Sequence, residues 1–88
     1  MKVEFRSSFA RDPRPLRDKS VKERVKATIQ QIEEVDDLRE ISNVRKLSGS
    51  GNYYRVRIGG YRLGLVLKQD TVVFVRCLPR RDIYQYFP

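Results

Sequence analysis

The 88-residue sequence contains no histidine, no tryptophan and a single cysteine, Cys77. One cysteine cannot form a disulfide within the chain, so covalent cross-links are excluded as a source of stability. The lack of histidine also excludes the mixed cysteine and histidine clusters that hold structural zinc. We therefore expect no metal and no cofactor, and a fold that depends on apolar packing.

Long apolar runs are absent as well. No stretch of about 18 apolar residues is present to cross a bilayer, and the amino-terminal MKVEFRSSF lacks the apolar region and cleavage site of a secretory signal. The sequence thus predicts a cytoplasmic protein with no membrane partner. Because 88 residues are too few for two separate cores, residues 1–88 are expected to form one domain.

Acidic residues are scarce in the carboxyl-terminal half. Residues 1–44 hold ten Lys/Arg and nine Asp/Glu, whereas residues 45–88 hold nine Lys/Arg and only two acids, Asp70 and Asp82. The formal net charge of +8 therefore belongs mainly to the second half. A segregated positive field of this kind favours a polyanionic partner, either nucleic acid or an acidic protein.

The first half predicts a strand followed by helices. Alternation within residues 1–9 indicates a short strand, and the prolines of 13–15 limit the next segment to a helical turn and a connector. The main helix is expected to begin at Ser20, since Ser20 and Glu23 have the spacing of a capping box, and to end near Asp36. It presents one apolar stripe, formed by Val21, Val25, Ile29, Ile32 and Val35.

The second half predicts three antiparallel strands. The apolar period changes to two from Tyr53 onward, and residues 59–60, both glycine, form a two-residue hairpin turn. The apolar run at 72–78 follows as a central strand, residues 38–52 are read as a connector, and 80–88 as a tail of undecided conformation. The fold class is therefore α+β: a short amino-terminal strand, and two helices packed on one face of a twisted antiparallel sheet that ends in a three-stranded meander.

The hairpin turn fixes the pairing of its two strands and brings arginines together. Arg57 should lie opposite Arg62, and Arg55 opposite Gly64. Like charges across a strand pair cost up to about 1 kcal/mol, whereas one charge-assisted hydrogen bond to an anion contributes roughly 1.5–3 kcal/mol. A phosphate held between the arginines would offset the repulsion, and Gly64 would leave room for it beside Arg55.

A simpler interpretation of these arginines is the solvated face of an amphipathic sheet. The lack of nearby acids, and the presence of Arg80 and Arg81 just past the last strand, favour an anion site. The sequence does not decide which face of the sheet carries the side chain of Arg76. A two-residue turn at 69–70 would direct Arg76 toward the core, and a three-residue loop would place it on the basic face.

Cleavage of RNA would also need a group that moves protons, and arginine is a poor proton acceptor. The candidates near the basic face are Tyr84, Lys46, Asp82 and Tyr61. Tyr84 is preferred because neighbouring arginines would help to remove its proton, although packing of the tail onto the sheet accounts for it equally well. Tyr86 suits packing or base stacking.

The segments VRKLSGSGNYYRVRIGGYRLGLVL at 44–67 and VVFVRCLPRRDIYQYF at 72–87 carry two patterns. The first combines Lys-Leu, a tyrosine with alternating basic residues, and Gly-x-Tyr-Arg, and the second is a strand followed by basic-basic-acidic-x-Tyr. Together they resemble the RelE/ParE superfamily of toxins from type II toxin–antitoxin systems, and the resemblance covers nearly the whole chain.

The resemblance implies a toxin that acts without metal and is neutralised by a cognate, acidic, DNA-binding antitoxin. In the RelE-like branch it implies cleavage of mRNA at the ribosomal A site. The catalytic residues implied are Arg55, Arg57, Arg62, Arg80 and Tyr84. The residues expected to bind RNA around them are Arg45, Lys46, Tyr61, Arg81 and Tyr86.

The leading hypothesis is thus a ribosome-dependent, metal-independent mRNA endoribonuclease that inhibits translation. One alternative is a ParE-like inhibitor of DNA gyrase, which uses the same scaffold as a binding module. Another is a domain that still binds RNA or antitoxin but has lost activity.

Overall fold

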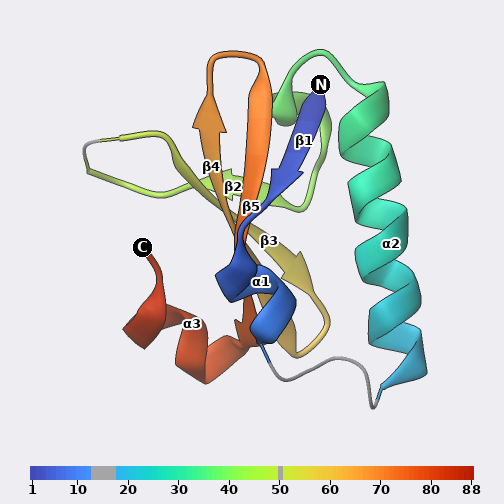
Figure 1. The fold of residues 1–88 in the computed structure, drawn as a ribbon, viewed down its shortest axis with the longest axis vertical. Coiled ribbons are helices and arrows are strands. Elements are labelled where there is room, and N and C mark those ends of the chain that lie inside the picture. Colours follow the sequence, from blue (N-terminus) through green and yellow to red (C-terminus); the bar gives the residue numbers. More distant parts are fainter. Residues whose placement is uncertain (13–17, 50) are drawn as a thin grey trace.

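Five strands form one mixed sheet, in the order β1-β5-β4-β3-β2, with helices on both of its faces (Figure 1). The computed structural model describes residues 1–12, 18–49 and 51–88. The elements are β1 (Lys2–Phe5), α1 (Ser7–Arg11), α2 (Lys19–Glu34), the 3₁₀ helix η2 (Leu38–Glu40), β2 (Val44–Lys46), β3 (Tyr53–Ile58), β4 (Tyr61–Lys68), β5 (Thr71–Pro79) and α3 (Arg80–Tyr86). No helix in this described part is long and apolar enough to span a membrane.

The α+β class, the first strand and the three-stranded meander of β3, β4 and β5 are confirmed. The sheet is not wholly antiparallel, because β1 pairs in parallel with β5. A further strand, β2, lies in the segment that was read as a connector and pairs with β3. The undecided tail forms the helix α3, which packs on the face of the sheet opposite to α2 (Figure 1).

The N-cap of helix α2 lies two residues earlier than the capping-box spacing predicts. Its N-cap is Asp18, whose carboxylate accepts hydrogen bonds from the backbone nitrogens of Ser20 (3.1 Å) and Val21 (3.2 Å). Ser20 itself lies inside the helix and donates its hydroxyl to Asp18, so its predicted capping role is wrong. Aspartate is as good an N-cap as serine, and here it satisfies two orphan backbone donors. The predicted connector at 13–17 lies outside the described residues.

The main core lies between α2 and one face of the sheet. The apolar stripe of α2 is confirmed, since Val21 and Ile32 are buried in this core and Val25, Ile29 and Val35 pack against it. The sheet contributes the alternate residues of its central strands, which are Val56, Ile58, Leu63, Leu65, Val72, Phe74 and Cys77. Cys77 is buried there, as expected of a small core residue.

The alternation of β5 reverses near its middle. Gly64 pairs with Arg76 and Leu65 with Phe74, so that Val75 is skipped. The preceding turn is the two-residue one at 69–70, which was expected to direct Arg76 toward the core. The shift at Val75 instead places Arg76 in the row of Gly64, on the face that carries the arginines.

Asp12 holds Arg76 at the edge of β5, beyond the point where β1 ends. Its carboxylate accepts hydrogen bonds from Nε and Nη2 of Arg76 at 2.7–3.1 Å, and from the backbone nitrogen of Cys77 at 2.6 Å. Asp12 is almost fully buried. The pair ties the end of α1 to strand β5, and the charge of Arg76 is thereby compensated.

Candidate active site

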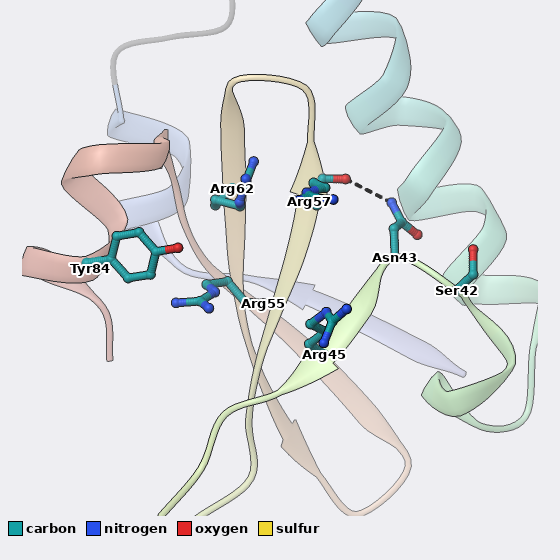
Figure 2. A pocket seen from close by; sticks show the side chains of 7 residues that line it. All are labelled: Ser42, Asn43, Arg45, Arg55, Arg57, Arg62 and Tyr84. Carbon is teal, nitrogen blue, oxygen red and sulfur yellow. Dashed lines mark hydrogen bonds between the residues drawn. The ribbon is translucent and has the colours of Figure 1, made fainter.

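Four arginines and one tyrosine converge on a pocket on the face of the sheet opposite to α2 (Figure 2). The pocket has a volume of about 290 Å³. Its lining residues come from β2, β3, β4, α3 and the segment before β2, and are Ser42, Asn43, Arg45, Arg55, Arg57, Arg62 and Tyr84. None of these side chains is a carboxylate, so the described lining is cationic and polar.

The strand register accounts for this convergence. Arg57 pairs with Arg62, and Arg55 lies between Arg45 on β2 and Gly64 on β4, as the two-residue turn predicts. Paired residues of antiparallel strands share one face, so the four guanidinium groups stand together. The turn itself favours a glycine at its first position, because Gly59 has a φ of +54°.

Arg62 is the most buried of the pocket arginines, with 7% of its surface exposed. Its Nη1 donates to the carbonyl oxygens of Gly59 (2.8 Å) and Tyr61 (2.7 Å). Burial, followed by the charge of Arg57, lowers the pKa of Arg62 below its ordinary value. No carboxylate pairs with it in the described part of the chain. An anion entering the pocket would therefore supply the counter-charge that this guanidinium lacks.

Tyr84 stands at the α3 side of the pocket, with its hydroxyl directed toward the arginines (Figure 2). The Cζ atom of Arg55 lies 4.6 Å from the centroid of its ring. A cation–π contact at an exposed site contributes about 0.5–1 kcal/mol, and 57% of Tyr84 is exposed. Burial of an apolar side chain such as Ile83 contributes about 1.5–3 kcal/mol. The packing of α3, rather than the contact with Arg55, therefore sets where Tyr84 lies.

Arg80 and Arg81 lie beside the pocket and not in its lining. Together with Tyr84 they line an adjoining hollow at the start of α3, whose other lining residues are Gly60 and Pro79. Arg80 is exposed and close enough to Arg62 to contribute to the lowering of its pKa. Tyr84 belongs to both hollows, so these arginines extend the positive surface past the tyrosine.

Lys46 and Tyr61 are not brought to the pocket. Lys46 pairs with Tyr54, one residue along from Arg45, and therefore points to the α2 side of the sheet, where it lines a different hollow. Tyr61 pairs with Ile58 and packs against the main core. Both were predicted to lie among the RNA-binding residues, and alternation along the strands places them on the wrong face for this pocket.

Two further predicted residues lie on α3 but outside the pocket lining. Tyr86 is exposed, and its ring centroid lies 5.8 Å from the Cζ atom of Arg76. Asp82, in the first turn of α3, lines neither hollow. Among the described residues that line the pocket, Tyr84 is thus the one member of the predicted proton-transfer group.

Sequence reasoning missed Ser42 and Asn43 at the other end of the pocket. The side-chain nitrogen of Asn43 donates to the backbone carbonyl oxygen of Arg57 at 2.9 Å (Figure 2), and the backbone carbonyl oxygen of Asn43 accepts from the backbone nitrogen of Arg57 at 3.1 Å. Asn43 therefore fixes the end of β3 that carries Arg57. Nothing in its local sequence marks this contact, which depends on the pairing of β2 with β3.

Gly64 does not leave room for a ligand. The ring of Phe87 packs directly against it, and a Cβ built at Gly64 would lie 2.7 Å from two of the ring carbons. The space beside Arg55 that was assigned to an anion is thus occupied by an aromatic side chain. The expected anion site shifts toward Arg57 and Arg62, away from the glycine.

Comparison with known proteins identifies the family of this chain. The sequence matches the family described as ParE toxin of type II toxin-antitoxin system, parDE, over residues 3–84. The chain belongs to this family, within the RelE/ParE superfamily, and is a toxin of a type II toxin–antitoxin system. Toxin RelE3 of Methanocaldococcus jannaschii is 36% identical to it over an alignment of 89 positions that covers 100% of both chains.

Solved structures show the same fold bound to antitoxins. A chain of the RelB-RelE antitoxin-toxin complex from Methanococcus jannaschii is 33% identical and superimposes with a TM-score of 0.79, covering 98% of this chain and 100% of that one. A chain of the archaeal RelE-RelB complex from Pyrococcus horikoshii OT3 is 24% identical, with a TM-score of 0.68 over 90% of this chain and 93% of that one. The second likeness concerns the fold alone.

Proposed function

We propose that this toxin is a ribosome-dependent endoribonuclease that cleaves mRNA without a metal and so inhibits translation. The observation that carries the proposal is the convergence of four arginines and the Tyr84 hydroxyl on one pocket, with Arg57 and Arg62 paired across two strands. The relative named RelE3 and the RelE chains of the solved complexes favour this branch of the superfamily.

The pocket fits a phosphodiester because it offers positive charge where negative charge would develop. In the proposed reaction a ribose 2′-oxygen attacks the adjacent phosphorus, and the bond from phosphorus to the 5′-oxygen breaks. Charge accumulates on the phosphorane oxygens, which guanidinium groups stabilise. Each charge-assisted hydrogen bond contributes roughly 1.5–3 kcal/mol, more than the repulsion of up to about 1 kcal/mol that the Arg57 and Arg62 pair costs. The products are a 2′,3′-cyclic phosphate and a 5′-hydroxyl.

Proton transfer is assigned to Tyr84. The 2′-hydroxyl loses a proton and the 5′-oxygen gains one, while arginine keeps its protons throughout. Tyr84 is the member of the described lining that suits such a transfer, and Lys46 lies on the other face. In this scheme Tyr84 protonates the departing 5′-oxygen, the proton of the 2′-hydroxyl passes to water, and Tyr84 regains its proton from water. We assign the alignment of the 2′-oxygen to the ribosome, which holds the mRNA.

The proposed partners follow from charge and from the relatives. A net charge of +8 favours an acidic antitoxin as well as RNA, and RelE chains in the solved complexes are bound to RelB. An mRNA substrate on the ribosome places the toxin in the cytoplasm. Copurification of the toxin with the acidic product of a neighbouring reading frame tests whether it binds such an antitoxin.

Primer extension on mRNA from a cell-free translation reaction tests the activity. Wild-type toxin is expected to produce new transcript ends only while the mRNA is being translated. Arg57→Ala should weaken cleavage, whereas Lys46→Ala, a matched loss of one positive charge on the opposite face, should not. Intact transcripts with full protein output would contradict the proposal.

A second candidate function is inhibition of DNA gyrase, and the ParE description of the matching family favours it. In that case the arginine surface would serve as a binding module and not as a catalytic site. Trapped gyrase–DNA cleavage complexes on plasmid, together with unchanged mRNA and little effect of Tyr84→Phe, would support it.

A further inference from the structure

Gly64, a glycine within strand β4, has the ring of Phe87 packed on it. A Cβ built at Gly64 would lie 2.7 Å from Cγ and Cδ1 of the ring, a separation that real Cβ atoms essentially never have. Any larger residue at this position would displace the ring. Glycine inside a strand weakens the strand. The close approach of the Phe87 ring explains why a glycine nevertheless occupies position 64.

Phe87 belongs to a second, small core between α3 and the sheet. Leu78, Ile83 and Phe87 form this core, and the ring of Tyr53 meets that of Phe87 edge to face at 5.8 Å between centroids. Only 6% of Phe87 is exposed. Its backbone nitrogen donates to the carbonyl oxygen of Ile83 at 2.9 Å, so the ring is tied to the last turn of α3.

In the sequence Tyr84 lies between Ile83 and Phe87, which are both buried in this second core. Ile83 points to the sheet and is fully buried, and the next residue of a helix is rotated by about 100°, which turns Tyr84 aside toward Arg55. Within the described part of the chain, the contact with Arg55 is the one ring interaction that holds Tyr84. The apolar side of α3 must therefore do most of the positioning.

We propose that Phe87, seated on Gly64, is a positioning residue that holds Tyr84 against Arg55. The catalytic meaning of this position rests on the proposed function, whereas the position itself does not. Phe87 is not among the residues that line the pocket. It packs on Gly64, the residue paired with Arg55. Its effect on RNA cleavage would therefore be exerted through α3 and Tyr84.

The position can be measured without any reaction, by NMR of the full-length toxin labelled with ¹⁵N-arginine. The ring of Tyr84 should shift the Nε–Hε signal of Arg55 upfield, and Tyr84→Ala gives the reference signal without the ring. Because the Phe87 ring itself lies beside Arg55, its direct effect on the signal is measured by adding Phe87→Ala to Tyr84→Ala. After that shift is subtracted, Phe87→Ala alone is expected to move the Arg55 signal to the reference position, and Gly64→Ala, which leaves no room for the Phe87 ring, to move it the same way. A signal that stays at its wild-type position in both variants would overturn the proposal.

A matched control separates positioning from loss of stability. Phe9→Ala likewise removes an aromatic ring, but one that is partly buried and packs on Phe74 in the main core. It should lower the melting temperature without moving the Arg55 signal. If Phe9→Ala and Phe87→Ala move that signal equally, the effect is general loosening and the proposal is wrong.

Cleavage of translated mRNA gives a second readout, as a double-mutant cycle. Tyr84→Ala should lower the rate by about 10²–10⁴-fold, and Phe87→Ala, which misplaces the tyrosine, should lower it on the order of 10²-fold. The double variant should be no slower than Tyr84→Ala beyond about twofold. Effects that multiply would show that Phe87 acts by another route. If the wild type cleaves no RNA, the proposed function fails, and the Arg55 signal still decides the positioning claim.

Discussion

Arg57 and Arg62 stand opposite each other across β3 and β4, and no carboxylate side chain lines the described pocket between them. Arg62 is nearly buried and its pKa is lowered by that burial. A protein that keeps two like charges in this arrangement gives up stability unless an anion joins them. The first prediction follows from this pair.

Inorganic phosphate is expected to raise the melting temperature of the toxin through this pair. Ligand at about 100 times its Kd stabilises by about 2.7 kcal/mol, and a domain of this size gains about 4–8 °C per kcal/mol. In Arg62→Met the rise should disappear, while the melting temperature without phosphate should be equal to or above that of the wild type. Thermal unfolding at constant ionic strength checks both, and an undiminished rise in Arg62→Met would contradict the assignment.

The tyrosine hydroxyl is predicted to matter more than its ring. Tyr84→Phe keeps the cation–π contact with Arg55 but removes the group that transfers protons, so cleavage of translated mRNA should fall by about 10²–10⁴-fold. Tyr61→Phe removes the same hydroxyl from the core side of the sheet and should leave cleavage unchanged. Equal rates for Tyr84→Phe and the wild type would remove Tyr84 from the mechanism.

The buried pair of Asp12 and Arg76 is expected to be a structural element. Asp12→Ala leaves a guanidinium without its main partner and removes an acceptor from the backbone of Cys77, so stability should fall by about 3 kcal/mol. Arg76→Met in the same chain should recover part of the loss, because the uncompensated charge is then removed. Urea unfolding of the two single variants and the double variant measures this coupling, and strictly additive losses would refute it.

The cap of α2 predicts a dependence of stability on pH. Hydrogen bonds from the Ser20 hydroxyl and the Val21 backbone lower the pKa of Asp18 from its ordinary value of 3.8. A carboxylate with a lowered folded-state pKa stabilises the fold above its unfolded value and loses that contribution as pH falls through the folded value. Asp18→Ala should therefore melt below the wild type near neutral pH, with a difference that shrinks below about pH 4.

Asn at position 18 provides the control, because its side-chain oxygen can cap the helix without titrating. Asp18→Asn should stay closer to the wild type than Asp18→Ala near neutral pH. A gap between Asp18→Ala and the wild type that does not change with pH would show that the cap contributes nothing through its charge.

The sequence predicts the hairpin in full, because a two-residue turn leaves a single register for β3 and β4. The same register already pairs Tyr61 with Ile58, a core residue, so alternation was sufficient to exclude Tyr61 from the arginine face. Lys46 could be excluded only once β2 was known, and three residues are too few to show a period.

Other features depend on contacts between distant segments that no local pattern records. The skipped Val75 reverses the side of Arg76, and nothing in the apolar run at 72–78 marks it. A glycine inside a strand can leave space for a ligand or allow another group to approach closely. At Gly64 only the fold shows that the second explanation holds, because the ring of Phe87 packs on it. The parallel pairing of β1 with β5 likewise joins distant segments, and no local pattern predicts it.

The central claim, that the arginine pocket holds the scissile phosphate of mRNA, is tested most directly by analysis of the ends of the cleaved transcript. Wild-type toxin in a translating extract should leave a 2′,3′-cyclic phosphate and a 5′-hydroxyl, and a single 2′-deoxy nucleotide at the cleavage site should block the cut. Arg62→Met should form the same ends at a rate lower on the order of 10²-fold. Ends of another chemistry, cleavage that ignores the 2′-deoxy substitution, or an unchanged rate in Arg62→Met would contradict the claim.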